Sequence, residues 1–306
     1  MTSGLHSYFI GLGALGGAFA AQVLKNNPQE IKVIAHGERA KKLHHGIYVN
    51  DIHYPLSVTD SPQEKADIIV VAVKYPQLEE AIKDIKPFVT SETLIISILN
   101  GLYSETRLSE VFGADKVIPA FGIAMDCSKE GNHIRYQNLG RIVFGDESNI
   151  VKSPRVKKVE HFFSANQIPY EIPEDMNRAI WFKFMLNSGV NQVSTLLRAP
   201  FKEFHNNDHA RELMITVARE VITLAQKKGI DLRDSDIELL VKTINALDPE
   251  GKTSMLQDIE AGRETEVNYF SGHIIQMGKE LNIPTPINEF LFHAIKYQEQ
   301  KVRRTF

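Results

Sequence analysis

One lysine and two asparagines stand out because their spacing places three polar groups on one face of a predicted helix. Lys183, Asn187 and Asn191 follow one another at intervals of four residues in the stretch 181–192. On an α-helix, residues spaced in this way lie along one stripe. The residues around them are mostly apolar, and a buried amine is costly unless something uses or neutralises it. The stripe therefore predicts a polar lining for a small ligand, and the alternative is a stripe that faces solvent.

A second polar stretch, residues 254–268, offers carboxylates without showing which of them would act. Ser254 stands where it could cap a helix. The carboxylates that follow are predicted to lie mostly at the surface: Asp258, Glu260, Glu264 and Glu266. Residue types and spacing alone do not select a catalytic member among them.

A glycine-rich loop near the N-terminus has the spacing of a dinucleotide-binding turn. Gly11, Gly13 and Gly16 form G-x-G-x-x-G, with Leu15 inside it, between a predicted strand and a predicted helix. The first glycine permits a tight turn, the second lets a pyrophosphate approach, and the third lets the helix pack on the sheet. Free N–H groups at the start of the helix favour phosphate. We expect this loop to bind a dinucleotide; the alternative is a glycine-rich packing turn.

The end of the second predicted strand bears on which dinucleotide would bind. NAD sites often have a carboxylate here, which accepts hydrogen bonds from the ribose. This chain has His36 at the position, with Glu38 close by, and the cations Arg39, Lys41 and Lys42 follow. Since a 2′-phosphate needs cationic partners, the sequence favours NADP over NAD. The alternative is that these cations belong to the solvated start of a helix.

The pattern of apolar runs predicts the elements that would hold these residues. Up to about residue 170, short apolar runs alternate with helical patterns, which indicates a parallel sheet covered on both faces. The predicted strands are Ser7–Ile10, Ile31–Ala35, Ile68–Val73, Leu94–Leu99, Lys116–Ala120 and a later strand that could be antiparallel, Arg141–Phe144; the first helix is Ala14–Lys25.

Helical patterns dominate the rest of the chain. The predicted helices are Met176–Leu197, Ala210–Lys228, Ile237–Ala246, Glu264–Leu281 and Asn288–Lys301. Gly229 and Pro284 fall where helices should end. We expect an α/β protein with a Rossmann-type, doubly wound N-terminal domain over residues 1–170 and an all-helical domain over residues 171–306. Ligands of such folds favour the carboxyl ends of the strands and domain interfaces.

Composition excludes several other classes of protein. The 306-residue chain is 43% hydrophobic and 24% charged, with a formal net charge of −3. This balance indicates neither a nucleic-acid partner nor a membrane protein, and no stretch approaches about 18 consecutive apolar residues. With Cys127 as its single cysteine and no signal-peptide pattern, the chain is expected in the cytoplasm. Cys127 could be a nucleophile, although a bystander is favoured, and no metal site is expected.

These motifs together resemble those of the ketopantoate reductase family (2-dehydropantoate 2-reductases). The resemblance covers nearly the whole chain: GLGALGG at 11–17, VAVK at 71–74, NG at 100–101, WFKFMLNSGVNQ at 181–192 and SMLQDIEAGRETEVNYFSG at 254–272. The last two are the most specific to the family. The resemblance implies an enzyme that reduces a small 2-keto acid to a D-2-hydroxy acid with a nicotinamide cofactor, with ketopantoate, in pantothenate biosynthesis, as the favoured substrate.

The resemblance also implies roles for single residues. Lys183 matches a catalytic lysine that protonates the carbonyl oxygen as hydride arrives, and Glu266 matches an acidic residue that pairs with this lysine. The substrate-binding matches are Asn187, Asn191 and Ser254, the last of them for the substrate carboxylate. The expected cofactor site comprises Gly11, Gly13, Leu15, Gly16, His36, Arg39, Lys74 and Asn100. Lys74 matches a lysine in the loop beside the cofactor, and Asn100 matches an asparagine near the nicotinamide.

Departures from the family's pattern leave the substrate and the cofactor open. His36 replaces a common arginine, and Gly251 and Lys252 occupy a stretch where many members have an asparagine. One alternative is a D-2-hydroxyacid dehydrogenase, D-mandelate-like, that acts on branched or aromatic 2-keto acids, with some relatives using NAD. Another is a dinucleotide-binding sensor without turnover, against which the retention of Lys183 with Glu266 argues. A homodimer is the weakly favoured assembly, because dimers are the commonest.

Overall fold

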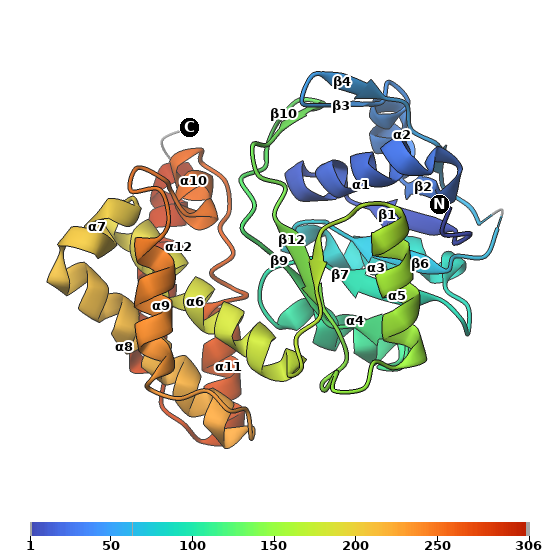
Figure 1. Cartoon of the computed structure of the whole chain (residues 1–306). Helices are drawn as coiled ribbons and strands as arrows, with labels where there is room; N and C mark the ends of the chain where they lie inside the picture. The colour runs from blue at the N-terminus through green and yellow to red at the C-terminus, as the bar shows by residue number, and fades with distance from the viewer. Residues whose placement is uncertain (1, 63, 304–306) are drawn as a thin grey trace. The chain divides into compact units, whose positions relative to one another are not determined.

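The computed structural model describes residues 2–62 and 64–303 and consists of two compact units (Figure 1). Unit 1 takes in the chain up to Asn100 together with Ser104–Met176. Unit 2 takes in Gly101–Tyr103 and the chain from Asn177 onward. In Figure 1, unit 1 runs from blue to green and unit 2 from yellow to red.

The centre of unit 1 is a six-stranded parallel sheet. Its strands are β1 (Ser7–Ile10), β2 (Ile31–Ile34), β5 (Val58–Thr59), β6 (Ile68–Val71), β7 (Leu94–Ser97) and β8 (Val117–Ile118). They follow the order β5-β2-β1-β6-β7-β8, and every neighbouring pair is parallel. This is the Rossmann-type order, in which the direction of winding changes between β1 and β6. The predicted fold class is therefore confirmed for this unit.

Helices flank the sheet, which explains why its central strands are apolar on both faces. All four residues of β1, of β6 and of β7 are buried. The helices of this part of the chain are α1 (Ala14–Asn26), α2 (Gly37–Leu43), α3 (Leu78–Ile85), α4 (Tyr103–Phe112) and α5 (Pro154–Ala165), with short 3-10 helices at Pro28–Glu30, Tyr75–Gln77 and Lys86–Phe88. Parallel strands covered in this way read as continuous apolar runs.

Two smaller sheets complete unit 1, and the sequence analysis missed most of their strands. The first has the order β10-β11-β3-β4, and the second β13-β12-β9. Their bounds are β3 (Ile47–Val49), β4 (Ile52–Tyr54), β9 (Ala120–Ile123), β10 (Ser128–Glu130), β11 (His133–Arg135), β12 (Arg141–Phe144) and β13 (Tyr170–Glu171). Strand β12 is antiparallel to β9, as its sequence suggested, and parallel to β13.

Unit 2 has helices and turns but no strand among its described residues, which confirms the expected helical character of the C-terminal part. The helices are α6 (Met176–Leu197), α7 (Phe201–Asn206), α8 (Asp208–Lys227), α9 (Asp236–Asn245), α10 (Ser254–Glu260), α11 (Ser271–Leu281) and α12 (Pro286–Arg303). Gly229 follows the end of α8 with a φ of 79°, a conformation that glycine adopts at little cost.

Two expectations about helix starts were wrong. Helix α11 begins at Ser271 rather than at Glu264, because Thr265 donates from its N–H and its hydroxyl to the buried Glu299 carboxylate, at 2.8 and 2.7 Å. Ser254 does not cap α10; Thr253 does, and its side chain accepts a hydrogen bond of 3.2 Å from the Leu256 N–H.

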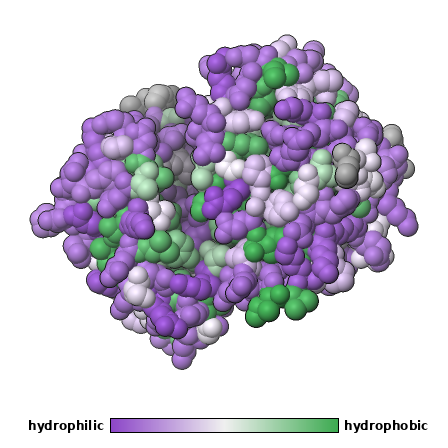
Figure 2. Space-filling view, viewed as in Figure 1, coloured by the Kyte–Doolittle hydropathy of each residue, from purple (hydrophilic) through white to green (hydrophobic). Residues whose placement is uncertain are grey.

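The face of the molecule seen in Figure 2 is mostly hydrophilic, and the apolar residues on it form separate patches. Apolar atoms make up a large part of the surface of most folded proteins. The large apolar side chains of β1 and α1, such as Phe9 and Phe19, are instead 1% and 0% exposed.

Candidate active site

The turn from β1 into α1 can be made only by glycine at two positions. Gly11 has a φ of 89°, and a Cβ on it would lie 2.6 Å from the backbone of Ala72 and Val73, just beyond β6. A Cβ on Gly16 would lie 2.1 Å from the Gly11 carbonyl oxygen, so this glycine brings α1 against the turn. Gly13 has open space around it, with its nearest neighbour, the Ala72 carbonyl oxygen, at 4.0 Å. The loop therefore leaves room for a ligand beside Gly13.

A cavity of about 240 Å³ opens beside this loop, at the carboxyl ends of β1 and β6. It is lined by Gly11, Leu12, Gly13, Arg39, Leu43, Ala72, Val73, Lys74, Gln77 and Lys129. Three of the lining side chains are cationic and none is acidic, so the cavity favours an anion. This is the place where Rossmann-type sheets bind dinucleotides. An open glycine turn and a cationic lining fit the phosphates of such a cofactor.

The cavity includes some of the expected cofactor residues and leaves out others. Arg39 and Lys74 line it, whereas Leu15, His36 and Asn100 do not. Leu15 instead packs against the hydrophobic core of unit 1. Asn100 follows β7, and its carbonyl oxygen accepts a hydrogen bond from the Tyr75 hydroxyl.

Sequence reasoning found no carboxylate at the tip of β2, but the fold brings one there from α3. The His36 Nε2 atom lies 3.5 Å from Oδ1 of Asp84. Burial raises the pKa of Asp84, and the positive charges of His36 and Arg39 oppose that rise. Lys41, expected among the phosphate-binding cations, pairs with Glu38 at 2.6 Å and does not line the cavity. Lys42 does not line it either.

The cation that sequence reasoning missed is Lys129. It belongs to β10, a strand of three exposed residues that shows no apolar alternation. Whether Lys129 can contact a cofactor depends on which loop it lies against, and the sequence shows only that it is a lysine. Lys129 donates a hydrogen bond to the Leu12 carbonyl oxygen inside the glycine turn.

In unit 2, the predicted polar stripe lies on α6, which spans the residues expected from the sequence. Asn187 and Asn191 are 5% and 7% exposed, and Lys183 is half-buried. Phe184, next to Lys183, is 1% exposed and stacks on Phe270 with ring centroids 6.1 Å apart. In these surroundings burial lowers the pKa of Lys183 from 10.5 to about 8. The amine therefore releases its proton more readily than an ordinary lysine does.

A buried polar network on α6, which the sequence analysis did not single out, fixes this helix in unit 2. Gln192 accepts a hydrogen bond of 3.0 Å from the Ser271 N–H and donates one of 3.2 Å to Asn288. Asn288 in turn donates to Glu220 at 2.7 Å. Because buried and satisfied networks hold their members in one arrangement, α6 presents its stripe from a rigid support.

Glu266 lies in the turn before α11 and is half-buried. The turn is held by hydrogen bonds from the Tyr269 and Phe270 N–H groups to its carbonyl oxygen, at 2.9 and 3.1 Å. Ser254 is exposed in the first turn of α10.

Three further points concern the cysteine, metal ligands and the helices. Burial and the negative charge of Asp126 raise the pKa of Cys127 to about 11, so its thiol is protonated at neutral pH and is a poor nucleophile. Among residues 2–62 and 64–303, no cluster of three His, Cys, Asp or Glu side chains is arranged to hold a metal ion. None of the helices in the same ranges has the length and apolar character needed to span a bilayer.

The strand order, the glycine turn and the cationic cavity define a dinucleotide-binding fold. More specifically, the chain belongs to the ketopantoate reductase family. The family model described as Ketopantoate reductase PanE/ApbA matches residues 8–149, and the one described as Ketopantoate reductase PanE/ApbA C terminal matches residues 175–299. The resemblance seen in the sequence is thereby confirmed. Members of this family are NAD(P)-dependent oxidoreductases that act on CH–OH groups.

Proteins of known name are similar to this chain in sequence or in fold. The 2-dehydropantoate 2-reductase of Pyrococcus abyssi is 28% identical over 300 residues, which cover 95% of this chain and 97% of that protein. D-mandelate dehydrogenase, solved with NADH and anilino(oxo)acetate, has a TM-score of 0.85 at 20% identity, over 97% of this chain and 99% of that one. The dimeric ketopantoate reductase of Staphylococcus aureus has a TM-score of 0.80 at 21% identity, over 97% and 100%.

Proposed function

We propose that this chain is a 2-dehydropantoate 2-reductase, which reduces ketopantoate to pantoate with NADPH in pantothenate biosynthesis. The observation that carries the proposal is the stripe on α6: Lys183, with a pKa of about 8, followed by two buried amides. A lysine so tuned is an acid suited to neutral pH. Family membership and the name of the Pyrococcus relative point to the same reaction.

The residues of unit 1 fit the cofactor. The turn at Gly11–Gly13 leaves its backbone open to a pyrophosphate, and the cationic lining of the neighbouring cavity suits further phosphate groups. A bound nicotinamide supplies the hydride in this chemistry. Asn100 follows β7, and we propose that it lies beside the nicotinamide.

The residues of unit 2 would bind and protonate the substrate. As a carbonyl carbon gains hydride, negative charge develops on its oxygen, and the Lys183 ammonium would stabilise that oxygen and then donate its proton. Asn187 and Asn191 would orient the keto acid through their amides, and Ser254 would bind its carboxylate. Glu266 would pair with Lys183 when the substrate is bound and keep the amine charged.

NADPH is the proposed cofactor because the cavity beside the glycine turn has three cations and no acid in its lining. One observation favours a second candidate function, a D-2-hydroxyacid dehydrogenase that uses NADH. Asp84 brings a carboxylate to His36 at the tip of β2, where NAD-binding folds often have an acid for the ribose hydroxyls. The NADH-bound D-mandelate dehydrogenase shares the fold of this chain.

The experiment that tests the proposal is a steady-state panel of both cofactors against ketopantoate, 2-ketoisovalerate and benzoylformate. We expect the highest kcat/KM with ketopantoate and NADPH. A higher value with benzoylformate and NADH would establish the second candidate instead. Cofactor binding with no turnover of any keto acid would establish the sensor. Light scattering on the same preparation would test the homodimer, the assembly that we propose by analogy with the dimeric Staphylococcus relative.

A further inference from the structure

Lys129 is a cation of the cofactor cavity that comes from outside the dinucleotide-binding sheet. It lies on β10, the edge strand of the small sheet β10-β11-β3-β4. Its amine donates to the Leu12 carbonyl oxygen, in the middle of the glycine turn. The same side chain lines the cavity together with Arg39 and Lys74. Strands β10 and β11 form an antiparallel hairpin. This hairpin adds the charge of Lys129 to a cavity at the carboxyl ends of the strands of the main sheet.

This hairpin is fastened firmly to α1. Ile134, on β11, is fully buried, and a Cβ on Gly17 of α1 would lie 2.1 Å from its Cδ1 atom. The second glycine of the GG pair at 16–17 therefore makes room for the hairpin. Ile134 therefore packs the hairpin directly on the helix that follows the glycine turn.

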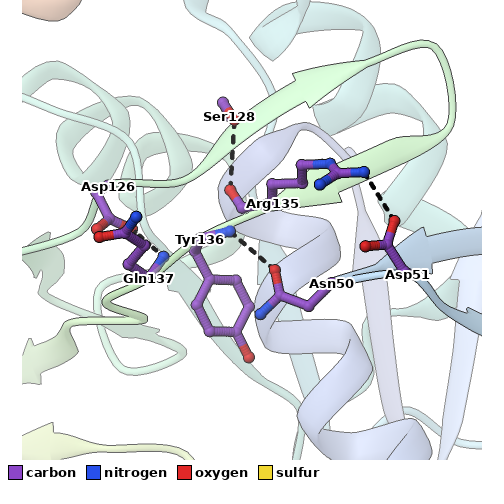
Figure 3. A pocket seen from close by; sticks show the side chains of 7 residues that line it. All are labelled: Asn50, Asp51, Asp126, Ser128, Arg135, Tyr136 and Gln137. Carbon is purple, nitrogen blue, oxygen red and sulfur yellow. Dashed lines mark hydrogen bonds and ion pairs between the residues drawn. The ribbon is translucent and has the colours of Figure 1, made fainter.

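Figure 3 shows how the base of the hairpin is tied to the turn between β3 and β4. The Tyr136 N–H donates to Asn50 at 3.0 Å, and Arg135 pairs with Asp51 at 2.8 Å. On the other side, Asp126 accepts from the Gln137 N–H at 2.9 Å. Since these polar groups satisfy one another, we assign the cavity of about 580 Å³ that they line a supporting role. The ties fix where β10, and with it Lys129, meets the glycine turn.

The electrostatics around Lys129 call for an anion. Burial and the positive charge of Arg39 both lower the pKa of the Lys129 amine, which means that the two cations lie close enough to repel each other. No acidic side chain lines the cavity itself, although the Asp84 carboxylate on α3 lies close enough to Arg39 to feel its charge. Cations gathered at one cavity attract an anionic ligand, which would reduce their mutual repulsion.

We propose that Lys129 is a specificity-determining residue that, together with Arg39, grips the 2′-phosphate of NADPH. This inference rests on the proposed preference for NADPH over NADH, and it assigns part of that preference to Lys129. Arg39 comes from the segment after β2, which is the ribose side of the site in this fold. The pyrophosphate would have the free N–H groups of α1 as its partners. The charge of Lys129 is therefore assigned to the 2′-phosphate.

The test is calorimetric binding of two cofactor fragments that carry no nicotinamide, ADP-ribose and 2′-phospho-ADP-ribose. Removing one charged partner of a phosphate, at a site that is partly exposed, costs about 5- to 50-fold in affinity. We expect Lys129→Met to lose about this factor for the 2′-phosphorylated fragment and to stay within about 2-fold of wild type for ADP-ribose. Lys129→Arg, which retains the charge, should stay within about 5-fold for both fragments.

Lys41→Met is the matched control, because it removes the same charge from a neighbouring helix at a side chain that is 73% exposed and paired with Glu38. It should change neither affinity by more than about 2-fold. An equal loss of both fragments in Lys129→Met, with the thermal unfolding midpoint unchanged, would overturn the proposal, because Lys129 would then serve the pyrophosphate. An unchanged affinity for 2′-phospho-ADP-ribose would overturn it as well.

The outcome for Lys129 is separable from the outcome for the reaction. Neither fragment transfers hydride, so binding is measured whether or not the chain reduces any keto acid. If wild type binds 2′-phospho-ADP-ribose more tightly and Lys129→Met abolishes the difference, the inference stands even where the ketopantoate assay fails. If wild type binds both fragments equally, the inference is overturned and the keto acid assay still decides the proposed reaction.

Discussion

Replacing Lys183 with methionine or alanine removes the proposed acid while leaving the cofactor cavity untouched. We predict that kcat falls by about 10²- to 10⁴-fold, the usual contribution of a general acid, and that the affinity for NADPH stays within about 2-fold. The fold should survive. A lysine whose pKa is lowered by burial costs stability at neutral pH, where the unfolded chain holds its proton more tightly, so the methionine variant should be at least as stable as wild type.

The pH profile gives the sharper measurement. With a pKa of about 8, Lys183 is about nine-tenths protonated at pH 7 and about one-tenth at pH 9. Since reduction needs the protonated amine, kcat/KM should be constant below pH 7 and fall about tenfold per unit above pH 8. If Lys183 had the pKa of an ordinary lysine, 10.5, kcat/KM would begin to fall only near that pH. Oxidation of the hydroxy acid needs the neutral amine, so its rate should rise through the same pH range.

Glu266 supplies the second half of this test. The lowered pKa of Lys183 comes from burial, and a carboxylate that approaches on substrate binding would raise it again. The pH at which kcat begins to fall should therefore be higher than the pH at which kcat/KM begins to fall. In Glu266→Gln the two pH values should be equal. This variant should lose less activity than a variant without Lys183.

The assay is stopped-flow and steady-state reduction of ketopantoate by NADPH, followed at the nicotinamide absorbance. Lys183→Arg tests whether charge alone suffices, and we expect no rescue because arginine retains its proton far more tightly. Lys228→Ala, at an exposed position after α8, is the control for loss of a lysine in unit 2. Wild-type kcat in Lys183→Ala would refute the reasoning: the stripe on α6 would then be structural, and the acid would have to be sought elsewhere.

Three further predictions concern the supporting structure. Gly16→Ala should weaken NADPH binding at least about 10-fold and lower the unfolding temperature, because its Cβ would meet the Gly11 carbonyl oxygen at 2.1 Å; unchanged binding in titration calorimetry would contradict this. Burial raises the pKa of Glu105 from 4.5 to about 8, so in urea titrations Glu105→Gln should be more stable than wild type by about 2–4 kcal/mol at pH 8, an advantage that fades as the pH falls to 4.5. Thr253→Ala should cost about 1 kcal/mol in the same assay and Ser254→Ala nearly nothing, since Thr253 caps α10; equal losses would be inconsistent with that cap.

The elements that the sequence predicted well are those whose environment is uniform along their length. Strand β1 is buried at every residue and reads as a continuous apolar run. Helix α6 carries an unbroken helical pattern, and its bounds agree with the expectation residue for residue. The glycine turn could be read because each of its glycines serves a local need of the backbone.

The parts that escaped prediction depend on contacts between segments far apart in the chain. Strand β10 is exposed at all three residues and shows no alternation, so neither the strand nor the position of Lys129 could be inferred. Asp84 reaches His36 only because the fold brings α3, from far along the chain, to the residue that follows β2. The false start of α11 has the same origin, since a helical pattern in the sequence is overridden by the bond from Thr265 to the distant Glu299.

The segment Gly101–Tyr103 belongs to unit 2, although the chain on both sides of it belongs to unit 1. Tyr103 packs against Tyr269 and His273, with ring centroids 5.5 and 6.0 Å apart. A fragment that begins near residue 177 would therefore lack Gly101–Tyr103, which are part of unit 2. During synthesis on the ribosome, Tyr103 leaves the exit tunnel long before its aromatic partners. This packing must therefore wait until residues 269–273 have been made. An exchange of unit 2 between relatives would require two exchanged segments rather than one.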